Sequence, residues 1–562
     1  MEYIIFFAVI ILFLVMYFIR CVIEERGKKK NFRENLYRDY GKEPQKKYPE
    51  GRLATLAGRY SKTSRLAEEQ VHRIDDITWN DLEMDRVFAR MDYTFSASGE
   101  EALYRMLRFP CMEEAPLLER ERLIRYFMEH EDDRVALQIL FARIGRTGKY
   151  SIYEYMEYLD HLKERKNTRH YLVLAAMALS IIVCFFDVGI GLTALAGLLC
   201  YNLVTYFKEK SDIDPYITTF SYVLRVLRME REFSKCNISA IKSYVDDMDK
   251  RRRKFGKFTR FSGLLTDQGS MSGNPLDIFV DYMRMGLHLN LIKFNTMLTE
   301  CKKYKDDIIS IMETMGFIES MISVGAYRAS LSLYCEPEFG QKEKMMQAEE
   351  IAHPLLAEPV QNSYALDKCM LLTGSNASGK STFLKTVAVA QIMAQSVHTV
   401  CAKAYRTAFY RIFTSMALRD DMASSESYFI VEIKALKRII DAAGQEGKPV
   451  LCFVDEVLRG TNTVERIAAA SQILEQMAES GVFCFAATHD IELTRLLEKE
   501  YENYHFEETI EENDVKFNYI LKEGRATSRN AIKLLAVLGY DEAIVSRAEH
   551  RANDFLSTGE WI

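Results

Sequence analysis

The most continuously apolar part of the chain lies near its start. Residues 3–19 read YIIFFAVIILFLVMYFI, and a helix of that length would be about 25 Å long, slightly short of the core of a bilayer. A cleaved signal peptide would need a basic start and small residues at its cleavage site. Here the basic residues follow the apolar run instead: Arg20, Arg26, Lys28, Lys29 and Lys30. The pattern therefore predicts an uncleaved transmembrane anchor that leads into the cytoplasm.

A second apolar stretch covers residues 171–207. One helix of that length would span about 55 Å, too much for a single crossing. Asp187, Gly189 and Gly191 lie in its middle and suit a tight turn, and lysines and arginines flank both ends, at 163–169 and 208–210. This pattern favours a transmembrane hairpin over residues 166–210, with its turn outside the cell. The alternative is a helical hairpin buried in a soluble core.

The remaining sequence changes character near residue 346. Before that point, amphipathic helical spacing dominates. After it, short β-like runs alternate with helices, and residues 370–373, 450–454 and 482–487 have the composition of buried parallel strands. We expect five regions: an anchor (1–30), a helical region (31–165), a membrane hairpin (166–210), a second helical region (211–345) and an α/β domain (346–562).

Composition narrows the class of protein. With 562 residues, 48% hydrophobic and 27% charged, the chain is neither disordered nor fibrous. A net charge of −6 argues against a surface coated in basic residues, although it leaves room for a local basic groove. The eleven cysteines are scattered singly, with no CxxC pair, which favours a reducing compartment over a disulfide framework or a zinc ribbon.

Residues 374–381 read GSNASGKS and match the phosphate-binding pattern GxxxxGK[ST]. The match follows an expected strand and opens an expected helix, so backbone N–H groups and the helix N-terminus would face the phosphates. We expect Lys380 to reach the β- and γ-phosphates of ATP and the Ser381 hydroxyl to bind Mg²⁺. The predicted nucleotide-binding residues of this loop are Gly374, Ser375, Asn376, Ala377, Ser378, Gly379, Lys380, Ser381 and Thr382.

Two carboxylates follow the next apolar strand, at Asp455 and Glu456. Because ligands of α/β sheets bind at the carboxyl ends of the strands, Asp455 is predicted to hold Mg²⁺ through water. Glu456 is predicted to be the general base that polarises the attacking water. A third strand ends before His489, which would then sense the γ-phosphate at the same edge of the sheet.

These segments together resemble the MutS family of DNA mismatch-repair ATPases. The similarity covers about residues 351–552: TGSNASGKSTFLK resembles the family's P-loop, DEVLRGTNT (455–463) its Walker B segment and ATHD (487–490) its switch-histidine segment. DDMASSESYFIVE (420–432) resembles the signature loop, and residues 524–548 resemble the helical dimerisation tail. A weaker resemblance to the family's helical core covers residues 75–124.

The resemblance implies an ABC-ATPase-like P-loop domain, preceded by a helical core and lever region that here carries transmembrane helices. It also implies ATP and Mg²⁺ as cofactors, Asn362 on the adenine side, and a homodimer in which Ser427 contacts the γ-phosphate held by the partner subunit. Within the dimerisation tail, Ile532, Leu535, Val537 and Leu538 would offer the apolar face.

Several positions depart from the family pattern. Ser425 and Glu426 stand where a glycine and a basic residue are usual, and Glu465 and Arg466 replace an expected Asp-Gly. We also expect no counterpart of the mismatch-reading N-terminal domain, because an apolar helix and a linker occupy that end of the chain. The membrane hairpin is foreign to the soluble repair proteins.

Residues 250–261, KRRRKFGKFTRF, form a basic stretch with interleaved aromatic residues. It could be a solvated helix face, a site for anionic lipid or a site for nucleic acid.

Two hypotheses of function follow. In the first, the chain is a dimeric MutS-like ATPase of the cell membrane, multi-pass, with its ATPase domain in the cytoplasm and DNA as its partner. In the second, the same ATP-driven clamp acts on a protein or lipid partner instead of DNA. A transporter ATPase is disfavoured, because there is no LSGGQ signature and three membrane helices cannot build a pore alone.

Overall fold

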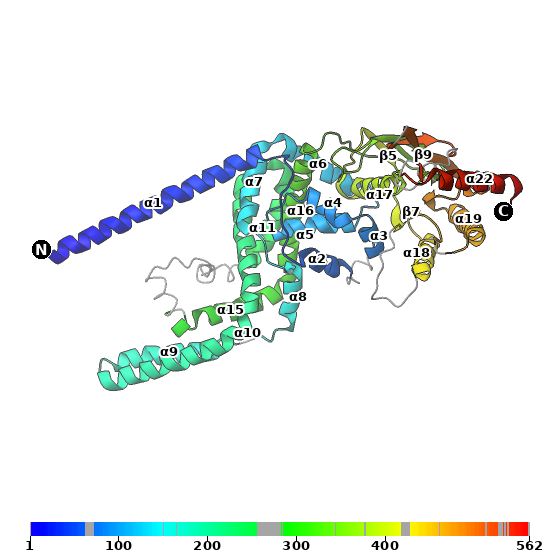
Figure 1. Cartoon of the computed structure of the whole chain (residues 1–562). Coiled ribbons are helices and arrows are strands. Elements are labelled where there is room, and N and C mark those ends of the chain that lie inside the picture. The colour runs from blue at the N-terminus through cyan, green and yellow to red at the C-terminus, as the bar shows by residue number, and fades with distance from the viewer. Residues whose placement is uncertain are drawn as a thin grey trace. The chain divides into compact units, whose positions relative to one another are not determined.

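The computed structural model divides the chain into two compact units that are not consecutive in sequence (Figure 1). Unit 1 contains residues 1–60, 92–104 and 123–329, and unit 2 contains residues 61–91, 105–122 and 330–562. The structure describes residues 2–61, 72–149, 151–164, 166–255, 283, 285–342, 344–375, 378–416, 428–459, 461–511, 514–526, 532, 535–536 and 539–559. Each unit is considered by itself below.

The regular secondary structure of the described residues of unit 1 is all helical, with irregular connections such as residues 43–49. Two of its helices, α5 (Ala97–Arg108) and α6 (Ala115–Glu129), also contribute residues to unit 2. The other elements are α1 (Glu2–Arg38), α2 (Arg52–Ser61), α7 (Glu131–Ile144), α8 (Ile152–His161), α9 (Thr168–Val183), α10 (Val188–Cys236), η2 (Ser239–Ile241), α11 (Lys242–Arg252), η3 (Arg253–Phe255), α15 (Leu289–Lys303) and α16 (Lys305–Ala329).

Helix α16 forms the core of unit 1. Two acidic residues, Asp306 and Asp307, lie in its first turn, where their negative charges interact favourably with the positive end of the helix dipole. From Ile318 to Arg328 every residue is buried, so this helix has no solvated face there and packs on all sides.

Helices α5 and α16 approach each other so closely that only glycine fits at their contact. A Cβ atom added at Gly316 would clash with the carbonyl oxygen of Ser98, and one at Gly99 would clash with the carboxylate of Glu319. That carboxylate accepts hydrogen bonds from the backbone N–H groups of Phe95 and Ser96. The close approach therefore lets a buried acid of α16 bind the backbone that leads into α5.

Helices α9 and α10 form an antiparallel hairpin at the predicted place (Figure 1). Asp187 caps the start of α10, since its side chain accepts a hydrogen bond from the N–H of Ile190 at 3.0 Å. By length and composition, two described helical segments could cross a membrane: Val188–Lys210, of which 11% is buried, and Lys305–Ala329, of which 72% is buried. The second is the core helix α16, whereas the first is an apolar helix with little protein around it.

The described residues of unit 2 form two sheets. The larger has the strand order β10-β9-β4-β8-β7-β6, and the smaller has the order β1-β5-β2-β3. The strands are β1 (Glu338–Phe339), β2 (Met346–Ile351), β3 (Asn362–Leu366), β4 (Cys369–Thr373), β5 (Ala404–Thr407), β6 (Arg411–Ser415), β7 (Val450–Asp455), β8 (Phe483–Thr488), β9 (Tyr501–Glu511) and β10 (Asp514–Glu523). The helices are α3 (Asp76–Asp81), α4 (Met84–Met91), α17 (Lys380–Val397), α18 (Tyr428–Ala443), α19 (Thr463–Glu479), α20 (Leu493–Leu496) and α22 (Glu542–Thr558).

The centre of the larger sheet confirms the predicted strands. β4, β8 and β7 are parallel neighbours, and every residue in them is buried. Such strands need cover on both faces, which explains their continuous apolar composition. The mixed α/β domain that follows a helical region agrees with the sequence prediction.

The division into units differs in form from the sequential regions expected from the sequence. Residues 72–91 and 105–122 belong with the α/β domain, although they lie near the start of the chain. Asp81, at the end of α3, shows why: its carboxylate accepts hydrogen bonds from Thr414 Oγ1 at 2.6 Å and from the N–H of Met416 at 3.1 Å. Residue 210, where we expected the hairpin to end, lies inside the single helix α10.

Replacing Gly316 by alanine should destabilise unit 1, because the added methyl group would push α16 away from Ser98. Overpacking of this kind costs roughly 1–3 kcal/mol. Gly58→Ala in α2 is the matched control, since nothing lies within 4 Å of its Cβ position and alanine favours the helix by roughly 0.5–1 kcal/mol. Thermal unfolding measures both. A Gly316→Ala chain as stable as the Gly58→Ala chain would contradict the close contact.

Candidate functional site

The loop after β4 has the backbone geometry that its glycines allow. Gly374 and Gly379 have φ values of +149° and +104°, and a Cβ at Gly379 would press against the ring of Tyr519 at 3.0 Å. Helix α17 begins directly after the loop, at Lys380. Asn376 and Ala377, two of the predicted loop residues, lie outside the described residues. The described part of the loop is thus a tight strand-to-helix turn with a helix N-terminus at its end.

Lys380 folds back over this loop. Its Nζ donates to the carbonyl oxygens of Gly374 at 2.9 Å and Ser375 at 2.8 Å, and the residue is 5% exposed. Burial lowers the pKa of Lys380 to about 8, although the carboxylates of Asp455 and Glu456 oppose that shift. The ammonium group is therefore held at the mouth of the loop by weak neutral acceptors that an anion could replace.

The strand register brings both predicted carboxylates to the same edge. Asp455 ends β7 and lies opposite Ala487 of β8, while the N–H of Glu456 donates to the carbonyl of Ala487 at 2.9 Å. Glu456 has a φ of +64°, an uncommon conformation for a residue other than glycine. This turn points the chain out of the sheet immediately after Asp455.

Glu456 is bound on both sides by basic groups. His489 Nε2 lies 2.6 Å from one carboxylate oxygen, and Arg459 forms an ion pair with the other. Burial would raise the pKa of Glu456, but the hydrogen bond from His489 and the charges of Arg459 and Lys380 hold it below its ordinary value. Glu456 is therefore an ionised carboxylate in this arrangement.

His489 bridges the loop and the carboxylate. Its Nδ1 lies 3.0 Å from the carbonyl oxygen of Gly374, and its Nε2 faces Glu456. Both neighbours are acceptors, so both ring nitrogens can donate at once only in the imidazolium form. His489, which follows β8, thus links the loop after β4 to the carboxylate after β7.

Lys380, Asp455, Glu456 and Arg459 line one cavity of 380 Å³. Its lining contains predicted residues and others that the sequence did not indicate: Ile351, Glu358, Val360, Asn362, Ser378, Gly379, Lys380, Ser381, Thr382, Phe383, Thr386, Asp455, Glu456, Arg459, Phe506 and Tyr519. The structure therefore brings loop residues 378–382, both carboxylates and Asn362 to one cavity, whereas Gly374, Ser375 and His489 are not among the residues that line it. Ser427 lies outside the described residues.

Asn362 has a visible structural role on its side of the cavity. Its Nδ2 donates to the carbonyl of Tyr519 at 3.1 Å, and its Oδ1 accepts from the N–H of Leu521 at 2.7 Å. It thereby ties β3 to the irregular part of β10, where the register shifts between Phe517 and Leu521. Tyr519 was missed because nothing in the sequence of this hairpin places it over a loop 140 residues earlier.

The comparisons with known proteins concern this domain. Residues 370–556 match the sequence profile of MutS domain V. DNA mismatch repair protein MutS of Thermotoga petrophila is 32% identical over 266 residues, which is 45% of this chain and 33% of that protein. DNA mismatch repair protein MutS 2 of Haloarcula marismortui is 35% identical over 182 residues, 32% of this chain and 19% of that protein.

The C-terminal part of this chain is therefore related to the MutS family. The chain spans about a third or less of the length of the curated relatives it matches. The family relation is therefore a statement about unit 2, and it extends to no partner or substrate of the whole proteins.

Two further residues have partners beside this site. Arg466 departs from the MutS pattern, and Glu432 was given no role from the sequence. Arg466 makes two hydrogen bonds to the carboxylate of Asp490, at 2.6 and 2.9 Å, and so ties α19 to the residue after His489. Glu432 of α18 is buried and accepts from the N–H of Leu458, beside the Walker B segment. Both contacts fix the loops that carry the catalytic candidates.

The basic stretch at 250–261 is only partly described, and its described arginines and Lys254 have acidic partners. Arg251 and Lys254 pair with Asp307, while Arg253 pairs with Asp249. Arg252 pairs with both Asp249 and the buried Glu230. Neutralised side chains of this kind favour a solvated helix face over a surface for phosphates at residues 251–254. Residues 256–261 lie outside the described part of the chain.

The titration of Lys380 predicts how nucleotide affinity depends on pH. A bound phosphate favours the charged ammonium, so binding raises the pKa of Lys380 above its value of about 8 in the free protein. Affinity for ATP should be level below pH 8 and fall by up to about tenfold per pH unit above it. Fluorescent-nucleotide titrations from pH 6.5 to 9.5 would measure this. Proton uptake on binding at pH 8.5, detected by calorimetry in two buffers, is the check; an affinity unchanged up to pH 9.5 would contradict it.

Proposed function

We propose that this protein is a membrane-anchored, dimeric MutS-family ATPase that hydrolyses ATP and binds DNA. The observation that carries the proposal is the convergence of Lys380, Asp455 and Glu456 on one cavity next to the N-terminus of α17. Family membership supports the ATPase activity, since the match covers the domain that contains this cavity.

The residues of the cavity fit ATP and Mg²⁺. Ser378 Oγ is buried and has no hydrogen-bond partner among the described residues, so it could donate to a phosphate oxygen. At Gly374 there is no room for a side chain, because a Cβ would lie 3.0 Å from the Phe506 carbonyl oxygen. Ser381 and Asp455 would hold Mg²⁺, and the backbone of residues 378–380 would hold the phosphates. Bound Mg²⁺ would supply charge neutralisation to the phosphates.

Hydrolysis would then depend on the release of Glu456. In the present arrangement its carboxylate accepts from His489 and pairs with Arg459, so it has little capacity left to take a proton from water. We infer that Arg459, whose side chain is 40% exposed, swings away when nucleotide is bound. His489 would remain and orient Glu456, because it is also anchored to the Gly374 carbonyl.

Two substitutions separate binding from hydrolysis. Lys380→Ala should weaken ATP binding by more than about tenfold, because it removes the buried cation of the loop. Glu456→Gln should still bind ATP but hydrolyse it about 10²-fold or more slowly, because an amide cannot act as the base. Radiolabelled-ATP binding and phosphate release measure the two steps, and Lys342→Ala, an exposed lysine of the same unit, is the control.

Glu456→Gln with ATP should also be a stable dimer by light scattering. Wild-type turnover by Glu456→Gln would show that another group is the base.

The DNA part of the proposal comes from the relatives, which are named as DNA mismatch repair proteins. The purified chain should bind duplex or branched DNA with an affinity that falls at least about tenfold between 50 and 200 mM salt, because counterions are released from the phosphates. Fluorescence anisotropy with matched, mismatched and four-way-junction DNA, with and without ATP, is the measurement. Lys380→Ala shows whether binding responds to nucleotide. If no DNA were bound at 50 mM salt in any nucleotide state, the ATP-driven clamp would act on a protein or lipid partner instead.

The exposed surface of the hairpin supports the membrane part of the proposal. At the turn between α9 and α10, Phe185 and Phe186 are 85% and 87% exposed, and Val204 on α10 is 71% exposed. A continuous apolar surface of this kind is unfavourable in water but suits a lipid bilayer. Arg169 and Lys208 lie at the base of the hairpin, as expected for its cytoplasmic side.

Reporter fusions test the topology. A phosphatase that is active only outside the cytoplasm should be active when fused after Asp187 and inactive when fused after Lys149 or Ile562. A fluorescent protein that folds only in the cytoplasm should give the reverse result. The reason is that positive flanks remain inside while the turn crosses. Phosphatase activity from the fusion at Ile562, or fluorescence from the one at Asp187, would contradict a membrane hairpin with unit 2 in the cytoplasm.

A further inference from the structure

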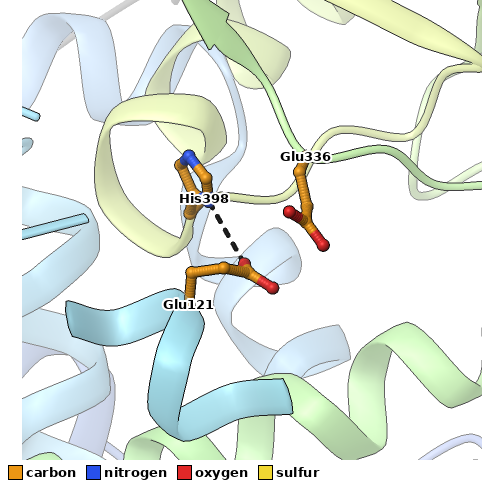
Figure 2. A group of neighbouring side chains, drawn as sticks. All are labelled: Glu121, Glu336 and His398. Carbon is orange, nitrogen blue, oxygen red and sulfur yellow. Dashed lines mark hydrogen bonds and ion pairs between the residues drawn. The ribbon is translucent and has the colours of Figure 1, made fainter. Parts of the chain in front are cut away.

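Three side chains with metal-binding atoms meet in unit 2, away from the nucleotide cavity. Glu121 belongs to α6, Glu336 precedes β1, and His398 is the residue that ends α17 (Figure 2). One ligand atom from each lies within 4.8 Å of the other two. We propose that Glu121, Glu336 and His398 form a binding site for a divalent transition-metal ion, with Zn²⁺ as the probe.

The geometry is close to that of a bound site. His398 Nδ1 and Glu121 Oε2 are 3.1 Å apart, and their side chains are 6% and 8% exposed. Ligand atoms about 2.0–2.2 Å from a zinc ion lie roughly 3–3.6 Å from one another. Glu336 is exposed, so its carboxylate can move the remaining distance without disturbing the core.

The backbone around the ligands holds them in place. Cys335 directly precedes Glu336, and Val400 lies two residues after His398. These two residues exchange two backbone hydrogen bonds, at 2.9 and 3.0 Å. On the other side, Arg120, next to Glu121, donates to the carbonyl oxygen of Ser396. The three chain segments are therefore fixed to one another within two residues of each ligand, which is the preorganisation that a metal site needs.

The charge and the donor atoms identify the kind of ligand. Two carboxylates, one of them buried and already paired with His398, lie beside each other, and an added cation would lower the repulsion between them. A divalent ion would balance both charges. One imidazole nitrogen with two carboxylate oxygens suits Zn²⁺, Mn²⁺ or Fe²⁺, whereas Mg²⁺ and Ca²⁺ prefer oxygen ligands alone.

The site is separate from the nucleotide cavity. His398 ends α17 and Lys380 begins it, so about 27 Å of helix lies between them. A metal ion there would act as a structural clamp that fastens α6 and the segment before β1 to the end of the helix that carries the P-loop lysine at its start. This inference does not depend on the proposed ATPase activity.

Zinc titration of the purified full chain tests the site. The chain is stripped with a chelator, kept free of nucleotide and titrated with Zn²⁺ in excess Mg²⁺, by calorimetry and by thermal unfolding. We expect one Zn²⁺ per chain at this site. Glu336→Gln should weaken that binding by at least about tenfold, since loss of groups that merely support ligands already has effects of that size. Because Glu336 is exposed, this variant should fold.

Glu507→Gln is the matched control, because it removes a carboxylate that lies 2.9 Å from another histidine of unit 2, His505. It should bind Zn²⁺ as the wild type does and show the same rise in unfolding temperature. An equal affinity for Zn²⁺ in the wild type and in Glu336→Gln would overturn the proposal. So would a wild-type chain whose unfolding temperature does not rise with Zn²⁺, because binding to the folded state must stabilise it.

Discussion

The parallel register of β4, β8 and β7 is the constraint on which the candidate site depends. Thr373 pairs with Thr488 and Asp455 pairs with Ala487, so the three strands end at one level. The glycine loop, Glu456 and His489 each follow directly after one of these strands, and Asp455 is the last residue of β7. A slip of one residue between β7 and β8 would turn Asp455 to the other face of the sheet, away from Lys380. The buried apolar residues of the strands fix that register, and chemistry at the edge follows from packing in the core.

At this edge, opposite charges are arranged so that each is satisfied without a ligand. Lys380 is held by loop carbonyls, and Glu456 by His489 and Arg459. Burying an isolated charge costs free energy of folding. These contacts lower that cost for Lys380 and Glu456 when no ligand is bound. They also set what binding must replace. Carbonyl acceptors are weaker partners for an ammonium than phosphate oxygens are, so exchange at Lys380 is favourable. The contacts of Glu456 are not replaced in this way, and in the proposed ATPase this difference would separate nucleotide binding from hydrolysis.

Much of the α/β domain could be predicted from the sequence, because its signals are local. A buried strand, a glycine loop and a helix follow one another within residues 369–397, and β7 carries its carboxylates at its own end. The contacts that the sequence did not predict join residues that lie apart in the chain. Arg466 meets Asp490, Glu432 meets Leu458, and Asn362 meets Tyr519. The local sequence around each of these residues does not indicate which residue it contacts. The same reason hid the pairing of Asp81 with β6, and with it the assignment of residues 72–91 to unit 2.

Helix α10 has two parts of contrasting burial within unit 1. At 49 residues it is about 73 Å long, far more than one membrane crossing requires. Its first part exposes apolar side chains such as Val204, whereas Tyr222, Val223 and Leu227 near its other end are fully buried. Tyr222 OH accepts from the N–H of Ser98 at the start of α5, so the buried end is bonded to the tight α5–α16 contact. The same continuous helix therefore carries the apolar part of the hairpin and the residue that is bonded to that contact. The hairpin and the helical core of unit 1 are thus joined by one helix without a break.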